Sequence, residues 1–168
     1  MARSTIRQLR PGDAGAYRDM RLEALAKAPE AFASTFESES VHPLEWFAER
    51  LAANAIFGAF QDTALVGIAA FFVHVAPKVA HKGTLWGMYV QPQARRTGIG
   101  RDLAETIISH ARQHVEQIQL TVVGGNEAAR SLYSNLGVVE YGREVRALKQ
   151  DGRYHDELLM ALALVPQR

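Results

Sequence analysis

The chain has 168 residues, with 19 Lys and Arg residues against 18 Asp and Glu residues, and it contains no cysteine. A chain of this length fits one domain and buries roughly 70% of its unfolded surface, so its core needs no disulfides. The lack of cysteine excludes a cysteine zinc site and an acyl-cysteine intermediate. A net charge of +1 argues against a dedicated nucleic-acid-binding protein. We therefore expect a single domain over residues 1–168 that binds no nucleic acid.

The apolar segments do not indicate a membrane address. Residues 1–13 contain no apolar run, so the sequence predicts no signal peptide. The most apolar stretch, residues 64–76, is interrupted by Gly67 and His74 and is shorter than the roughly 18–20 apolar residues that span a bilayer. We expect a cytoplasmic protein without a membrane segment.

Apolar periodicity and turn residues predict a strand, two helices and then three strands in the first half of the chain. In chain order these are a strand over 5–9, a helix capped by Asp13 and running to about Lys27, a loop or broken helix over 31–41, a helix after Pro43, and strands over 56–60, 65–75 and 84–90.

The second half alternates helices and strands and ends in a hairpin. The pattern predicts a helix from Gly98 to about Val115, a strand over 119–123, a helix over 126–136 capped by Asn126 and ended by Gly137, and a hairpin of 138–149 and 155–162 around Asp151-Gly152. The sum is an α+β fold with a mostly antiparallel central sheet flanked by helices. Exposed strand edges of the hairpin, over 141–149 and 155–162, leave a homodimer open.

The loop between the strand that ends at Val90 and the helix that begins near Gly98 contains no acidic residue. Gly98 and Gly100 let backbone N–H groups approach an anion at a helix N-terminus. Arg95, Arg96 and Arg101 add full positive charges that suit phosphate groups. The loop thus predicts a polyphosphate site, although a tight turn with solvent-facing arginines explains the loop alone equally well.

Two common nucleotide motifs do not fit this loop. A dinucleotide fingerprint needs a third glycine, where this chain has Leu103. A Walker loop needs Gly-Lys-Ser/Thr, where this chain has Arg101-Asp102 after the last glycine.

Two spaced motifs resemble the GNAT N-acetyltransferase superfamily. Arg95-Arg96-Thr97-Gly98-Ile99-Gly100 is similar to its pyrophosphate-binding loop, Arg/Gln-x-x-Gly-x-Gly/Ala, and Met88-Tyr89-Val90-Gln91-Pro92 looks like its fourth strand. The segment 126–137 resembles its second block, Asn-x-x-Ala-x-x-x-Tyr-x-x-x-Gly, and the order of predicted elements follows the family from end to end. One departure is Val138, where the family usually has Phe.

The resemblance implies acetyl-CoA as the donor and a primary amine as the acceptor, and we expect no metal cofactor. It implies that the pyrophosphate is held by Arg95, Arg96, Thr97, Gly98, Ile99, Gly100 and Arg101, and that the pantetheine arm lies along Met88, Tyr89 and Val90 beside Asn126, Ala129 and Tyr133. A small molecule is the expected acceptor, ahead of a protein N-terminus or lysine. The alternative is a domain of this fold that binds acyl-CoA as a sensor or interaction module without transfer.

Tyr133 is the expected general acid. A departing thiolate needs a proton, and a phenol with a pKa of about 10 can donate one to a thiolate whose pKa is near 8.5. The competing interpretation places Tyr133 on the apolar face of its helix with Ala129, Leu132 and Leu136. Because there is no cysteine, we expect direct transfer in a ternary complex.

The base that takes the proton of the amine is not identified by sequence. His74, His81, Glu37, Glu39 and Glu45 are candidates, as is a water molecule. Residues 30–49 are acidic and either form a solvated face or attract a cationic acceptor. His110 and His114 have a metal-ligand spacing, but no Glu completes a His-Glu-x-x-His pattern and cysteine is absent, so we expect no metal site there.

Overall fold

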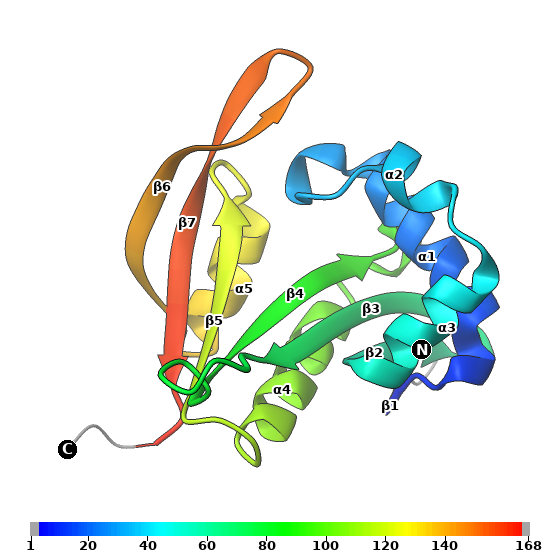
Figure 1. The fold of residues 1–168 in the computed structure, drawn as a ribbon, viewed down its shortest axis with the longest axis horizontal. Helices are drawn as coiled ribbons and strands as arrows, with labels where there is room; N and C mark the ends of the chain where they lie inside the picture. The colour runs from blue at the N-terminus through cyan, green and yellow to red at the C-terminus, as the bar shows by residue number, and fades with distance from the viewer. Residues whose placement is uncertain (1–3, 166–168) are drawn as a thin grey trace.

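Seven strands form one sheet in the order β1-β2-β3-β4-β5-β7-β6, and helices cover its faces (Figure 1). The computed structural model describes residues 4–165. The strands are β1 (Ser4–Gln8), β2 (Ala55–Gln61), β3 (Ala64–Val73), β4 (Lys82–Val90), β5 (Gln117–Val123), β6 (Val139–Gln150) and β7 (Arg153–Ala163). The helices are α1 (Ala14–Lys27), α2 (Phe36–Ser40), α3 (Leu44–Ala53), α4 (Ile99–Ala111) and α5 (Glu127–Asn135), with 3-10 turns η1 (Pro11–Asp13), η2 (Pro29–Ala31) and η3 (Pro92–Ala94). The expected α+β fold is confirmed.

The sheet is antiparallel except between β4 and β5. These two strands run parallel and pair over only three positions, from Lys82 opposite Gln117 to Thr84 opposite Gln119. Beyond Thr84 they separate, and Figure 1 shows their arrows diverging toward their C-terminal ends. The sheet therefore consists of two arms, β1–β4 and β5–β7, joined at one short seam.

Each face of the first arm has its own hydrophobic core. On one face α4 buries Leu103 and Ile107 against the sheet, because its apolar residues recur at helical spacing. On the other face α1 and α3 pack together, with the Tyr17 and Phe47 rings in a T-shaped pair whose centres are 6.2 Å apart. The two cores fix the helices on either side of β4.

A buried ion pair attaches α2 to α1. The guanidinium of Arg21 donates to both carboxylate oxygens of Glu39, at 2.9 and 2.8 Å, and both side chains are 5% exposed. Burial by itself raises the pKa of Glu39, but the hydrogen bonds and charge of Arg21 outweigh it and hold the pKa below its ordinary value. The short α2 stands within residues 31–41, where a broken helix was one expectation, and Thr35 caps it.

Two expectations about local structure are wrong. Asp13 is at the N-cap position of α1, but its carboxylate accepts from the backbone N–H of Arg10 at 2.8 Å and from Arg7, which lowers the pKa of Asp13 to about 2. In the final hairpin β7 pairs with both β5 and β6 over residues 157–161, so it has no free edge there. Open edges along the hairpin remain on β6 and at the start of β7, residues 153–155, which weakens the structural basis for the expected homodimer.

We expect Glu39→Ala to lower the free energy of unfolding by about 3–5 kcal/mol, because it leaves the Arg21 guanidinium buried without a partner. Glu37→Ala, at an exposed position of the same helix, is the control and should change it by less than about 0.5 kcal/mol. Urea unfolding measures both. Since the pKa of Glu39 is lowered, its contribution is present above pH 4.5 and is lost as the pH falls through the folded-state pKa. Equal effects of the two substitutions would contradict this assignment.

Candidate active site

A cavity of about 480 Å³ opens where β4 and β5 separate. Its lining comes from both arms of the sheet and from the segment between α1 and α2. The lining includes Arg21, Phe32, Ser34, Glu39, Arg50, Thr84, Trp86, Gly87, Met88, Thr121, Asn126, Ala129, Tyr133 and Glu157. The volume is in the range of small-molecule sites.

A β-bulge shapes the β4 wall of this cavity. Ile68 pairs with Tyr89 and Ala70 pairs with Trp86, so β4 has one residue more than β3 between these pairs. Gly87 lies in this bulge with a φ of +64°, a left-handed conformation that favours glycine. A bulge leaves backbone groups out of the ladder, so the bulge can present N–H groups to a ligand in the cavity.

Tyr133 lies in the wall of the cavity at the other arm. It belongs to α5, which Asn126 caps by accepting a hydrogen bond from the N–H of Ala129 at 3.2 Å. The helix ends before Gly137, whose φ is +87°. Only 4% of Tyr133 is exposed, and burial raises its pKa far above the ordinary value, so its hydroxyl stays protonated. Tyr133 therefore packs with the core and also lines the cavity, and its role as general acid stays a prediction.

The glycine loop lies at the end of β4. Gly98 has a φ of +87°, and the first returning bond of α4 runs from the N–H of Asp102 to the carbonyl of Gly98. The N–H groups of the first turn therefore have no partner inside the helix and point to the loop. A side chain at Gly98 would meet nothing within 4 Å, and one at Gly100 would come no closer than 3.6 Å to Leu132. The loop thus has the open backbone that a pyrophosphate needs.

The arginines of the loop are less free than their spacing suggests. Arg95 donates from Nε to the carbonyl of Val90 at 2.9 Å, and Arg101 forms an ion pair with Glu105 at 2.9 Å. Arg96 has a φ of +60° and forms no ion pair within residues 4–165. The side chain of Thr97 donates to the carbonyl of Ala94 and closes the preceding turn.

The three strand residues expected at the donor site face different ways. Met88 lines the cavity. Tyr89 packs in the core beside α1, where its hydroxyl donates to Glu23 at 2.8 Å, and burial together with Glu23 raises its pKa to about 12. Val90 packs against the α4 core, and Ile99 is buried there as well. Of Tyr89, only the main chain is available to a ligand on the cavity side.

Few of the expected bases reach the cavity. Glu37 and Glu45 are exposed and lie outside its lining, as do His74 and His81. Glu39 lines the cavity, but Arg21 holds both of its oxygens. The acidic segment therefore contributes one buried, already paired carboxylate to the site.

Sequence reasoning missed Trp86, Arg50, Thr121 and Glu157. These residues come from β4, α3, β5 and β7, and no motif links them along the chain. Only the pairing of the strands reveals the position of Glu157, opposite Val123 in the neighbouring β5.

His110 of α4 and His114, in the turn that follows this helix, stack on each other, with ring centres 4.4 Å apart. Burial and the neighbouring His114 lower the pKa of His110. Within residues 4–165 no group of three His, Asp or Glu side chains is arranged to hold a metal ion. In the same range no helix is long and apolar enough to cross a membrane.

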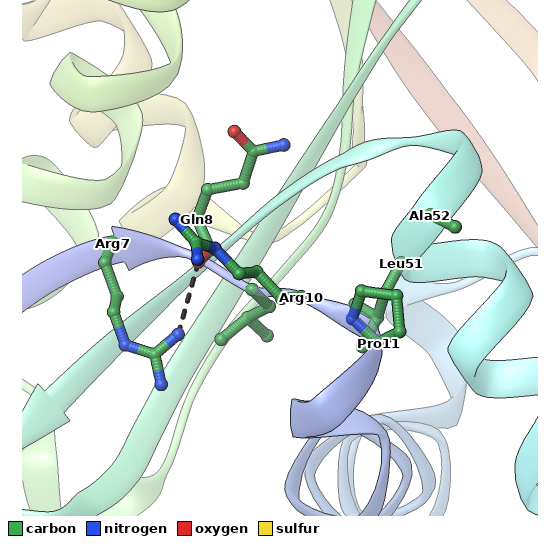
Figure 2. A pocket seen from close by; sticks show the side chains of 7 residues that line it. Arg7, Gln8, Arg10, Pro11, Leu51 and Ala52 are labelled. Carbon is green, nitrogen blue, oxygen red and sulfur yellow. Dashed lines mark hydrogen bonds between the residues drawn. The ribbon is translucent and has the colours of Figure 1, made fainter.

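A second hollow, of about 620 Å³, lies at the outer edge of the sheet between β1 and the end of α3 (Figure 2). Figure 2 shows the Arg7 side chain turned back toward the carbonyl of Gln8, with Arg10 and Pro11 beyond it. Asp13 neutralises Arg7, and none of the expected site residues lines this hollow. The cavity between β4 and β5, which Met88, Asn126, Ala129 and Tyr133 line, is therefore the candidate site.

Residues 20–138 match the acetyltransferase (GNAT) family, and the chain belongs to this family. It is 32% identical over 130 residues to the ribosomal protein bS18-alanine N-acetyltransferase of Escherichia coli strain K12, covering 75% of this chain and 86% of that one. It is 31% identical over 144 residues to the mycothiol acetyltransferase of Thermomonospora curvata, covering 84% of this chain and 46% of that protein. The chain thus spans about half the length of this second relative.

A solved structure supports the same fold. The yncA protein of Salmonella typhimurium, described as a putative acetyltransferase with its cofactor acetyl-CoA, superimposes with a TM-score of 0.83 over 99% of this chain and 96% of that one, at 20% identity. The expected class, an N-acetyltransferase of the GNAT family, is confirmed at the level of the family.

We expect Gly100→Val to abolish CoA binding, because its side chain would keep the pyrophosphate from the backbone of the first turn of α4, and to leave the fold intact, because its Cβ would make only ordinary contacts, at 3.6 Å to Leu132 and 3.8 Å to Val90. Gly15→Val, at an open position of α1, is the matched control and should bind as the unmodified protein does. Isothermal titration with CoA and thermal unfolding measure the two properties. If the binding isotherm of Gly100→Val matches that of the unmodified protein, the loop does not bind the pyrophosphate of CoA.

Proposed function

We propose that this protein transfers the acetyl group of acetyl-CoA directly to a primary amine of a small molecule. One observation carries the proposal: the cavity between the separated strands places a protonated phenol, Tyr133, and a strand bulge, at Gly87, on its two walls. The glycine loop adjoins these walls, since Gly100 lies against Val90 of β4 and Leu132 of α5. A donor whose phosphates bind the loop can therefore extend its thioester into the cavity.

The chain supplies what an acyl transfer to nitrogen requires. A bond forms between the amine nitrogen and the acetyl carbon while the carbon–sulfur bond breaks, and a neutral amine loses one proton as the sulfur gains one. Tyr133 gives that proton, and its raised pKa keeps the proton in place until charge develops on the sulfur. Backbone N–H groups of the β4 bulge donate hydrogen bonds to the carbonyl oxygen as it becomes negative.

The proposed role of each donor-site residue follows from its position. Backbone N–H groups of residues 97–101 bind the pyrophosphate, and Arg96 is the side chain with its charge available. The main chain of residues 88–90 pairs with the pantetheine arm, while Ala129 leaves room for it beside Asn126.

The relatives support the donor and leave the acceptor open. One is named for the alanine of ribosomal protein bS18 and the other is named a mycothiol acetyltransferase. A protein of the same fold has acetyl-CoA bound. These acceptors differ in size and kind, so they do not select one for this chain.

The direct test is release of the CoA thiol from acetyl-CoA in the presence of a panel of primary amines, with mass spectrometry of the products. Transfer predicts thiol release that depends on the amine and yields one N-acetyl product for each thiol. If acetyl-CoA binds by titration calorimetry but no amine, including protein N-termini, promotes release, the domain is a binding module and the proposal fails.

We expect Tyr133→Phe to lower kcat by about 100-fold or more while the affinity for acetyl-CoA changes by less than threefold, because the ring is kept and only the proton donor is lost. Tyr141→Phe, at an exposed position of β6, makes the same chemical change away from the cavity and serves as the control. Steady-state kinetics and calorimetry give the two quantities. Equal losses in turnover and affinity would contradict the role of an acid.

A further inference from the structure

One arm of the cavity has an excess of positive charge. Arg21 and Glu39 neutralise each other through two hydrogen bonds. Arg50, half-buried near the end of α3, lines the same cavity, and within residues 4–165 it has no carboxylate oxygen within 4.0 Å. These three ionised groups therefore sum to one positive charge.

Aromatic rings hold this guanidinium in place. The central carbon of Arg50 lies 4.5 Å from the ring centre of Trp46 and 5.2 Å from that of Trp86. Nε of Arg50 and Nε1 of Trp86 are buried, and neither has a hydrogen-bond acceptor in the described part of the chain. Buried donors without acceptors are rare in folded proteins. Both atoms are enclosed by protein, so an anion in the cavity would meet Arg50 through its outer guanidinium nitrogens, which form no ion pair within residues 4–165.

The other arm of the cavity has an excess of negative charge. Glu157 lines the cavity from β7 and forms no ion pair within residues 4–165. Burial raises the pKa of its carboxyl, Glu144 directly across on β6 raises it further, and a hydrogen bond with Thr121 lowers it. Two like charges opposite each other on neighbouring strands are unfavourable. A cationic group at Glu157 would relieve them.

We propose that the acceptor is a zwitterion of the amino-acid type, whose carboxylate binds Arg50 and whose amino group lies at Glu157, which takes its proton. This inference rests on the proposed function and names its substrate class. Arg50 stacks on Trp86 of β4, whereas Glu157 pairs with the end of β5, so the two charges belong to the two arms between which transfer takes place. Phe32 and Trp86 supply apolar surface for the remainder of the acceptor.

The protons balance with Glu157 as the base. An ammonium group loses two protons when it becomes an amide. The first passes to the carboxylate of Glu157 and from there to solvent, which frees the nitrogen lone pair for attack. The second leaves the nitrogen as the carbon–sulfur bond breaks and replaces the proton that Tyr133 gives to the sulfur.

The experiment compares free amino acids with their carboxamides as acceptors in the thiol-release assay. The carboxamide keeps the size and removes the negative charge. Its amine is the weaker base and is less protonated at neutral pH, so a preference for the acid does not come from the fraction of free amine. We expect at least one free amino acid to exceed its carboxamide about 10- to 100-fold in kcat/KM.

Two substitutions separate the two ends of the acceptor. Arg50→Met should lower kcat/KM for the amino acid about 10- to 100-fold and leave the carboxamide within threefold, with Arg50→Lys between the two. Arg18→Met is the matched control, because Arg18 stacks over Phe47 outside the cavity. Glu157→Gln should lower kcat about 100-fold for both acceptors, and Glu144→Gln, at its exposed cross-strand neighbour, should have a much smaller effect.

The outcomes distinguish this inference from the proposed function. If amines without a carboxylate, such as diamines or peptides, are acetylated as well as amino acids, or if Arg50→Met affects acid and carboxamide equally, the substrate class is wrong and the acetyl transfer stands. If no amine promotes thiol release, the proposed function itself fails. A Glu157→Gln variant with unchanged kcat removes Glu157 as the base.

Discussion

The short seam between β4 and β5 is the constraint on which the rest of the site depends. Three residue pairs join the two arms, and the last residues before the split include Gly83, where a side chain would come within 2.3 Å of the Phe71 ring. The absence of a side chain there lets Phe71 pack directly under the seam. Beyond it, β3 keeps β4 on one arm and β7 keeps β5 on the other, so the gap cannot close by pairing of the strands. The fold thus holds open the space into which a donor and an acceptor can enter from different sides.

The segment between α1 and α2 forms a further wall of the cavity between β4 and β5. Its turn η2 contacts β5 and β6, while Arg21 and Glu39 attach α2 to α1 on the opposite arm. The segment therefore spans both arms and brings Phe32 and Ser34 into the cavity wall. A buried ion pair adds little net stability over apolar packing but is costly to break. Its geometric effect, a fixed wall built from a segment of mostly irregular structure, matters more for the site.

Sequence patterns predicted the parts of the fold that local chemistry determines. The Asn126 cap, the end of α5 at Gly137 and the Asp151-Gly152 turn, where both residues have positive φ, each depend on a few neighbouring residues. The unpredicted features depend on contacts between distant segments. The carboxylate of Asp13 pairs with Arg7 and forms no capping hydrogen bond with α1. Strand β7 lies between β5 and β6 and not at an edge of the sheet. Arg50 and Glu157 carry no local sequence signal, and their position at one cavity results only from the arrangement of the two arms.

The charge of the cavity wall limits which acceptors it can bind. Its four charged side chains, Arg21, Glu39, Arg50 and Glu157, sum to zero, yet only the first two are paired with each other. A simple amine or a polyamine would match Glu157 and leave the partly desolvated Arg50 charge with no nearby counter-charge except Glu39, which is already paired with Arg21, and this is unfavourable. A simple anion would match Arg50 and leave the charge of Glu157 without a partner. A molecule that is itself neutral but carries both charges compensates each group and adds no net charge to a half-buried site. A chain of near-zero net charge can therefore still have a strongly polar cavity, because its unpaired positive and negative side chains lie on opposite sides of the gap between the arms. An acceptor with both charges would contact both of them.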